Sequence, residues 1–162
     1  MTTAGLDHQQ SESGVARFLE KEALLRARLS SLGSVVVAFS GGTDSAYLAF
    51  VASSTLGDRA LCVTADSASY SSRHRQSATD LALRFNLRHE FIVTAEIDNP
   101  AYRANAPDRC YHCKRELFTH LTKLAREQGF ASVLDGSNAD DRGDYRPGRQ
   151  AAREMGVVSP LD

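Results

Sequence analysis

The stretch SVVVAFSGGTDS, residues 34–45, decides the fold of this chain. Its first half, Ser34–Phe39, is a short, continuous run rich in valine, which is typical of a strand buried on both faces of a parallel sheet. Its second half, Ser40–Ser45, is a turn with two glycines, and the apolar spacing of Ala46–Leu56 then predicts a helix. A buried strand, a glycine turn and a helix in this order predict the first unit of an α/β domain.

The same alternation of strand and helix continues on both sides of this stretch. Ahead of it we expect a helix at Val15–Leu32, ended by Gly33. Further strands are predicted at Ala60–Ala65, Arg88–Thr94 and Ser132–Asp135, and the start of a fifth at Val157–Ser159. Helices are predicted at Ser72–Phe85, Cys113–Gln128 and Gln150–Met155, and an irregular loop at Glu96–Arg109. The fold class is therefore α/β with a doubly wound parallel sheet, with residues 15–162 as one domain and residues 1–14 as a disordered N-terminus.

The composition excludes several classes of protein. The chain has 162 residues and a formal net charge of -1, from 19 Lys and Arg against 20 Asp and Glu. This balance argues against a large nucleic-acid surface. No apolar run approaches the roughly 18–20 residues of a membrane span, and the polar stretch Met1–Gly14 lacks the apolar core of a signal peptide. Because 3 cysteines cannot all pair within one chain, we expect a cytoplasmic protein with reduced thiols.

The SGGTDS turn has the composition of an anion site. Gly41 and Gly42 allow positive φ angles and a close approach of the backbone to a ligand, and the following helix directs its unpaired N–H groups and positive dipole end at the same point. Hydroxyl groups are supplied by Ser40, Thr43 and Ser45. Asp44 would repel a bare phosphate, so its presence indicates a bridging Mg²⁺. The alternative is an ordinary glycine turn in which Asp44 caps the helix.

SGGTDS matches neither the Walker A loop nor the G-x-G-x-x-G fingerprint, but it resembles the PP-loop motif SGGxDS of the ATP pyrophosphatases. The resemblance implies an adenine nucleotide α-hydrolase-like fold with the strand order 3-2-1-4-5. It also implies that the chain binds ATP with Mg²⁺, that ATP is cleaved between its α- and β-phosphates, and that the loop holds pyrophosphate while the substrate becomes an adenylate. Enzymes of this type include amidating synthetases and tRNA-thiolating enzymes.

Further segments are similar to the LarE group of ATP-dependent sacrificial sulfur transferases. The motifs are RCYxCK within residues 99–118, DGxNxDDxxDYRPG within residues 135–152, VTADSASY at residues 63–70 and GVVSPL at residues 156–161. The resemblance implies adenylation of a small-molecule carboxylate on a nicotinic-acid-derived nucleotide, followed by sulfur transfer. Members of that group continue into a C-terminal segment with the sulfur-donating cysteine or with cluster-binding cysteines. We therefore expect this chain to be truncated, half of a split enzyme or a stand-alone adenylating domain in a homo- or hetero-oligomer, with a partner subunit carrying the donor cysteine.

Cys110 and Cys113 form a C-x-x-C pair flanked by Arg109 and Lys114. A helix N-terminus and nearby cations lower the pKa of a thiol, which favours a redox or sulfur-carrying pair. A second alternative is half of a zinc site with His112 or His120, although zinc needs four ligands. The third is a structural or substrate-contacting segment, in which Arg109 and Lys114 bind the phosphates or carboxylate of the substrate.

Two more loops follow predicted strands and therefore belong to the same edge of the sheet. In the first, Asn138, Asp141 and Arg146 are candidates for substrate positioning, and Arg146 would balance charge on the α-phosphate; a solvated acidic turn is the alternative. The second loop follows the second strand and contains Ser67. The resemblance implies that the nucleotide lies against the first two strands, with Ala38, Phe39 and Thr64 at the base and Ser67 at the ribose. The alternative is that these are ordinary core and turn residues.

The function predicted from the sequence is adenylation of a carboxylate by ATP, as a step in sulfur incorporation. The first alternative is another PP-loop ligase that uses ammonia or thiolates tRNA. The second is a nucleotide-binding subunit that acts with a separate catalytic partner. Release of pyrophosphate by the isolated chain separates an enzyme from a binding subunit.

Overall fold

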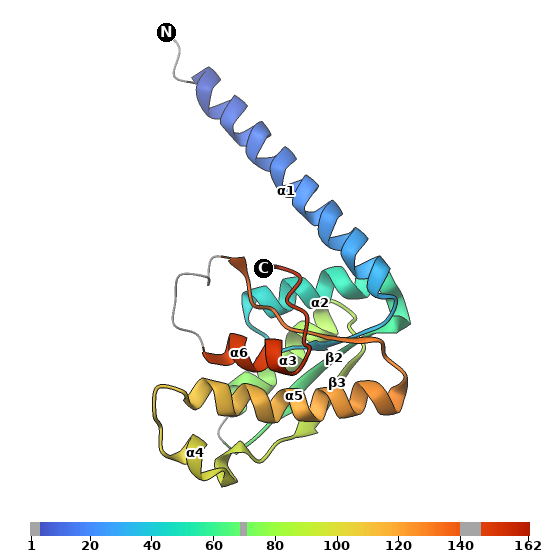
Figure 1. The fold of residues 1–162 in the computed structure, drawn as a ribbon. Helices are drawn as coiled ribbons and strands as arrows, with labels where there is room; N and C mark the ends of the chain where they lie inside the picture. Colours follow the sequence, from blue (N-terminus) through green and yellow to red (C-terminus); the bar gives the residue numbers. More distant parts are fainter. Residues whose placement is uncertain (1–3, 69–70, 140–146) are drawn as a thin grey trace.

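The computed structural model describes residues 4–68, 71–139 and 147–162 (Figure 1). The strands are β1 (Val35–Ala38), β2 (Ala60–Asp66), β3 (His89–Val93) and β4 (Ser132–Leu134). The α-helices are α1 (Ala4–Leu32), α2 (Thr43–Leu56), α3 (Ser72–Arg84), α4 (Pro100–Arg103), α5 (Arg109–Gln128) and α6 (Pro147–Glu154). Two short 3-10 helices are η1 (Gly57–Arg59) and η2 (Glu96–Asp98).

The strands form one parallel sheet in the order β3-β2-β1-β4. Val37 of β1 is in register with Cys62 of β2 on one side and with Leu134 of β4 on the other. The predicted parallel α/β sheet and the order of its first four strands are therefore confirmed.

The predicted fifth strand at Val157–Ser159 is wrong in its extent. In the described part of the chain, Val158 makes a single parallel bridge to Leu134, and no strand is formed there. The bridge lies on the outer side of β4, where the fifth strand was expected. Gly156 has a φ of 68° just before this segment, and Pro160 just after it lacks the N–H that a ladder needs. These two residues limit the pairing to isolated bridges, the second of which joins Leu161 to Asn138.

Helices cover both faces of the sheet because alternate residues of a strand point to opposite sides. On one face, Val35 and Val37 pack with Leu48 and Val51 of α2 and with the end of α1. On the other face, Val36 packs with residues of α5 and α6, among them Phe118, Leu121 and Ala151. Figure 1 shows α5 and α6 together on one side of the strands and α2 on the other. The doubly wound arrangement is thereby confirmed.

Helix α1 begins at Ala4, so the structure differs from the predicted disordered N-terminus over residues 4–14. No proline interrupts this stretch, and the helix continues unbroken into the predicted segment at Val15–Leu32. Leu25 and Leu29 are buried against α2, whereas Phe18 and Leu24 are exposed. Figure 1 shows why: the first half of α1 projects from the domain. None of the described helices is long and apolar enough to cross a membrane.

The segment predicted to be an irregular loop, Glu96–Arg109, contains η2 and α4. Asn99 stabilises the start of α4 because its Oδ1 accepts a hydrogen bond from the N–H of Ala101 at 3.0 Å. Helix α5 begins at Arg109, one turn earlier than predicted. Both cysteines of the C-x-x-C pair therefore lie within the first turns of α5.

Candidate functional site

The candidate site lies where the carboxyl ends of β1, β2 and β4 meet. From β1 the chain crosses through α2 to β2 on one side, while β4 lies on the other side. This reversal of direction is the point at which open α/β sheets bind ligands. Residues 39–42 connect β1 to α2 there, and residues 135–139 leave β4 beside them.

The connection from β1 to α2 is closed by its own serine hydroxyls. Ser45 Oγ is buried, donates to the carbonyl oxygen of Gly42 at 2.9 Å and lies 3.0 Å from Ser40 Oγ. The N–H groups of Ser40 and Gly42 donate to Ser45 Oγ and Ser40 Oγ, each at 3.3 Å. Gly41 has a φ of 78°, and its α-carbon faces the backbone of Ala78 in α3 so closely that a β-carbon would lie 3.2 Å from the Ala78 nitrogen. The turn is thus a fixed loop that needs glycine at position 41.

The start of α2 leaves backbone donors at this loop. Gly42 occupies the N-cap position, and no side chain in the described part of the chain caps the helix. Thr43 and Asp44 follow as the first helical residues and are exposed. Asp44 is therefore not the N-cap residue. The alternative, an ordinary glycine turn in which Asp44 caps the helix, is wrong on this point. A helix start with uncapped N–H groups is suited to an anion.

The segment after β4 lies against the same loop. Gly136 is so close to α2 that a β-carbon on it would lie 2.9 Å from the Ser45 nitrogen. Asn138 Nδ2 donates to Asp44 Oδ2 at 3.1 Å. The structure therefore brings together Asp44 and Asn138, which the sequence had placed 94 positions apart.

A buried carboxylate that the sequence did not single out holds this segment. Asp135 is 1% exposed and forms an ion pair with Lys114 Nζ at 3.5 Å. Lys114 also lies over the ring of Phe118, with its Nζ 5.2 Å from the centroid. Asp135 stands at the carboxyl end of an apolar strand, and this position was the signal in the sequence that could have identified it.

The residues that start α5 contact α4. Arg109 Nη2 donates to the Tyr102 hydroxyl at 2.5 Å and Nη1 donates to Asn105 Oδ1 at 3.1 Å. The guanidinium carbon of Arg109 also lies 4.3 Å from the centroid of the Tyr102 ring. These contacts fix Arg109 at the junction of α4 and α5.

The three cysteines, all of which the structure describes, form no disulfide; Cys110 is exposed and Cys113 is half-buried. Among residues 4–68, 71–139 and 147–162, no group of three or more His, Cys, Asp or Glu side chains is arranged to hold a metal ion. His112 contacts Asp108 at 3.3 Å and His120 contacts Glu116 at 3.1 Å, each along the same helix. The zinc alternative for the C-x-x-C pair therefore has no support in the described residues.

The residues predicted to contact the base are buried at the ends of β1 and β2. Thr64 Oγ1 donates to the carbonyl oxygen of Phe39 at 2.6 Å and lies 2.8 Å from His89 Nε2. The Phe39 N–H donates to the Val63 carbonyl at 2.9 Å. Ala38 faces the α5 side of the sheet, and the Phe39 ring contacts the His89 ring edge-on with centroids 5.5 Å apart. The Phe39 side chain is thus part of the core, and burial lowers the pKa of His89, an effect that Glu90 partly opposes.

Ser67 follows β2, is buried, and donates to Glu96 Oε1. Glu96 is 2% exposed and belongs to η2, and nothing in the sequence identified it. Thr94, whose N–H donates to the Asp66 carbonyl oxygen at 3.2 Å, has a buried hydroxyl with no hydrogen-bond partner among the described residues. The predicted site residues Asp141 and Arg146 lie outside the described residues.

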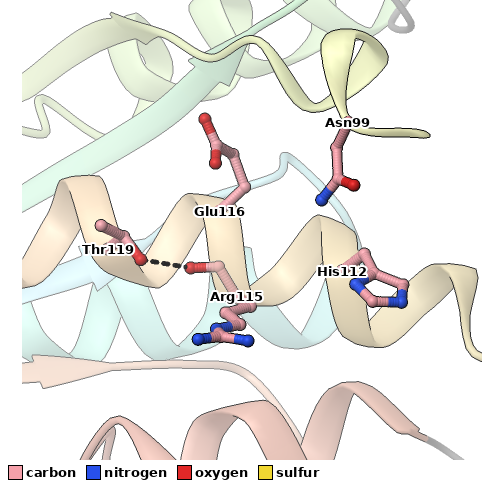
Figure 2. Close-up of a pocket in the computed structure, with 5 residues that line it drawn as sticks. All are labelled: Asn99, His112, Arg115, Glu116 and Thr119. Atoms are coloured by element: carbon pink, nitrogen blue, oxygen red, sulfur yellow. Dashed lines mark hydrogen bonds between the residues drawn. The ribbon is translucent and has the colours of Figure 1, made fainter. Parts of the chain in front are cut away.

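A small cleft of about 150 Å³ lies between α5 and Asn99, the N-cap residue of α4 (Figure 2). Its lining is polar and consists of Asn99, His112, Arg115, Glu116 and Thr119. Thr119 Oγ1 donates to the carbonyl oxygen of Arg115 at 2.8 Å, as the dashed line in Figure 2 shows. Of these side chains, only His112 was named from the sequence, as a candidate zinc ligand.

Comparison with known proteins finds related sequences over most of this chain. The asparagine synthase family model matches residues 21–142. Pyridinium-3,5-bisthiocarboxylic acid mononucleotide synthase of Lactiplantibacillus plantarum is 34% identical over 148 residues, which are 91% of this chain and 54% of that protein. The uncharacterized protein slr1717 of Synechocystis is 44% identical over 137 residues, which are 85% of this chain and 51% of that protein. The chain thus spans about half the length of these relatives.

Solved structures share the fold. NMN synthetase of Francisella tularensis superposes with a TM-score of 0.59 at 24% identity, covering 75% of this chain and 55% of that one. The NH3-dependent NAD synthetase of Campylobacter jejuni gives a TM-score of 0.60 at 16% identity, covering 75% and 56%.

Proposed function

Since the chain belongs to the asparagine synthase family, the PP-loop family expected from SGGTDS, we propose that it binds ATP at Ser40–Ser45 and catalyses cleavage between the α- and β-phosphates to adenylate a carboxylate. The observation that carries the proposal is the loop at the start of α2, which the hydroxyls of Ser40 and Ser45 hold in place. There Gly41 adopts a positive φ, and no described side chain caps the helix. A phosphate group is the ligand that such a helix start binds best.

In this proposal, the residues of the loop have different roles. Ser40 and Ser45 hold the turn through their mutual hydrogen bonds, while the N–H groups of Thr43 and Asp44 and the helix dipole stabilise pyrophosphate as it leaves. The exposed carboxylate of Asp44 is a hard oxygen ligand, fits Mg²⁺ and would hold it here. When bound, Mg²⁺ neutralises phosphate charge. Asn138 orients that carboxylate through its hydrogen bond to Oδ2.

The acceptor in this proposal is a carboxylate of a nicotinic-acid-derived nucleotide. The printed name of the Lactiplantibacillus plantarum relative, a synthase of a pyridinium bisthiocarboxylic acid mononucleotide, supports this choice. Arg109 and Lys114 lie at the start of α5 and would bind the acceptor's phosphate or carboxylate, and Asp141 and Arg146 would complete its site. A cysteine thiolate then attacks the acyl carbon of the adenylate, and AMP leaves with the electron pair of the broken C–O bond to give a thioester. That thiolate belongs to a partner or segment with a donor cysteine, or is Cys110 or Cys113.

The test incubates the full chain with MgATP and nicotinic acid mononucleotide, and measures pyrophosphate and AMP. We expect pyrophosphate release that Asp44→Ala abolishes and that Asp58→Ala, an exposed acidic residue in η1, leaves unchanged. Release of inorganic phosphate without pyrophosphate would contradict cleavage between the α- and β-phosphates. An amide product formed with ammonia would favour the amidating alternative, and ATP binding without turnover would favour the binding-subunit alternative.

A further inference from the structure

Asp135 is a buried carboxylate with four donors around it, and the proposed reaction does not use it directly. Its Oδ1 accepts from Ser159 Oγ at 2.6 Å and from the N–H of Ser137 at 3.3 Å. Its Oδ2 accepts from Ser137 Oγ at 2.8 Å and lies 3.5 Å from Lys114 Nζ. A carboxylate that is 1% exposed is tolerated only where such donors replace its water.

These donors come from three separate parts of the chain. Lys114 belongs to α5, Ser137 to the segment after β4, and Ser159 to residues 157–162, which we call the strap. The strap also bonds the same segment through its backbone: the Asp135 N–H donates to the Val158 carbonyl at 3.0 Å and the Ala139 N–H donates to the Leu161 carbonyl at 3.2 Å. Asp135 thus joins α5 and the strap to the segment that leaves β4.

That segment is the one that contacts the phosphate loop. Gly136, the next residue, has its α-carbon against the backbone of Ser45. Two residues further, the amide of Asn138 donates to Asp44, and Arg149 Nη1 donates to the Asn138 carbonyl oxygen at 3.1 Å. A displacement of Asp135 would therefore change the position of Asn138 and, with it, the orientation of the Asp44 carboxylate.

We propose that Asp135 is a positioning residue of the nucleotide site: it fastens α5 and the strap to residues 136–138, and so sets the orientation of Asp44 for MgATP. This inference rests on the proposed binding of ATP at Ser40–Ser45. Asp135 acts through Gly136 and Asn138 and does not contact the nucleotide. Lys114 takes part through its ion pair with Asp135.

The decisive variant is Asp135→Asn, which preserves the shape of the side chain. The amide nitrogen cannot accept from the Ser137 hydroxyl or pair with Lys114, so two donors lose their acceptor. We expect about a tenfold weaker affinity for MgATP, measured by calorimetry. We also expect a higher Mg²⁺ concentration for half-maximal binding. A loss of stability alone would not move the Mg²⁺ requirement, because that value reports the Asp44 carboxylate.

Ser34→Ala is the matched control. Ser34 Oγ accepts the Ala131 N–H at 3.0 Å and joins β1 to the start of β4 at the opposite edge of the sheet. This variant should lower the urea midpoint and leave both MgATP affinity and the Mg²⁺ requirement unchanged. Combining Asp135→Asn with Asn138→Ala should give less than the product of the two single effects, because both act on Asp44 through one path.

If Asp135→Asn does not fold, Ser159→Ala answers the same question, since it removes one donor and keeps the carboxylate. We expect it to weaken MgATP binding about threefold in the same direction. The inference is overturned if wild type binds MgATP and either folded variant binds it with wild-type affinity and an unchanged Mg²⁺ requirement. Failure of the wild type to bind MgATP would instead refute the proposed function.

Discussion

Gly136→Ala tests the contact that brings the segment after β4 against the phosphate loop. The added β-carbon would lie 2.9 Å from the Ser45 nitrogen and 3.1 Å from its α-carbon. Both neighbours are backbone atoms at the start of α2, so they cannot turn aside as the end of a side chain would. Either the segment after β4 or the first turn of α2 has to move.

The size of the effect follows from that distance. An ordinary contact begins at 3.4 Å, so the two backbones must separate by about 0.5 Å. Overpacking of this kind costs about 2 kcal/mol, which for a chain of this length lowers the Tm by about 4–8 °C. The loss of MgATP affinity should be larger than this general loss of stability explains, because the movement also separates Asn138 from Asp44.

Thermal unfolding and calorimetric titration with MgATP measure the two effects. Gly14→Ala is the matched control, because Gly14 lies in α1 with no atom within 4 Å of an added β-carbon. There alanine should stabilise the helix by up to about 1 kcal/mol and leave MgATP affinity unchanged. The reasoning is refuted if Gly136→Ala has the Tm and the affinity of the wild type.

Three further predictions concern the core and the thiols. A maleimide should modify Cys110 in the native protein, whereas Cys62 should react only after unfolding, because burial raises the pKa of Cys62 to about 12. Peptide mass spectrometry distinguishes the two labelled cysteines. Native labelling of Cys62 would contradict its burial. Burial lowers the pKa of His89, so the unfolded chain takes up this proton first, and stability should fall as the pH drops below about 6.5. In His89→Gln, the loss of unfolding free energy between pH 7.5 and pH 5.5, measured by urea unfolding, should be smaller than in the wild type. An equal loss in both proteins would contradict the role of His89. Leu29→Ala should cost about 3 kcal/mol in urea unfolding because Leu29 is fully buried, while Leu24→Ala, at an exposed position of the same helix, should cost less than about 0.5 kcal/mol; similar losses at both positions would contradict the placement of α1.

The features that could be predicted from the sequence are those set by local pattern. Ser34–Ser45 carries a buried strand, a turn and a helix start in consecutive residues, so its structure and the parallel sheet around it followed directly. The glycine turn at a helix start followed as well, because Gly41 and the start of α2 are neighbours in the chain; the anion site there stays a prediction. The family expected from SGGTDS was likewise confirmed.

The features that were missed depend on contacts between distant residues. Asp135 becomes a junction only when α5 and the strap reach it in the folded chain. Glu96 is buried in the folded chain and accepts a hydrogen bond from Ser67, 29 positions earlier. The fifth strand was wrong for a different reason: Pro160 and Gly156 leave too little regular backbone for more than isolated bridges.

Helix α1 extends far beyond its contact with α2, so a small rotation at that contact moves the far end of the helix by a larger distance. Its last turns are seated on α2 through Leu25 and Leu29, and from Leu25 back to Ala4 the helix extends about 32 Å at about 1.5 Å per residue. Helix α2 begins at the phosphate loop, so any rotation of α2 on its axis would be transmitted to α1. A tilt of about 5° would carry the far end of α1 through about 3 Å. A spin label near that end would thus magnify a movement that is too small to detect at the loop itself.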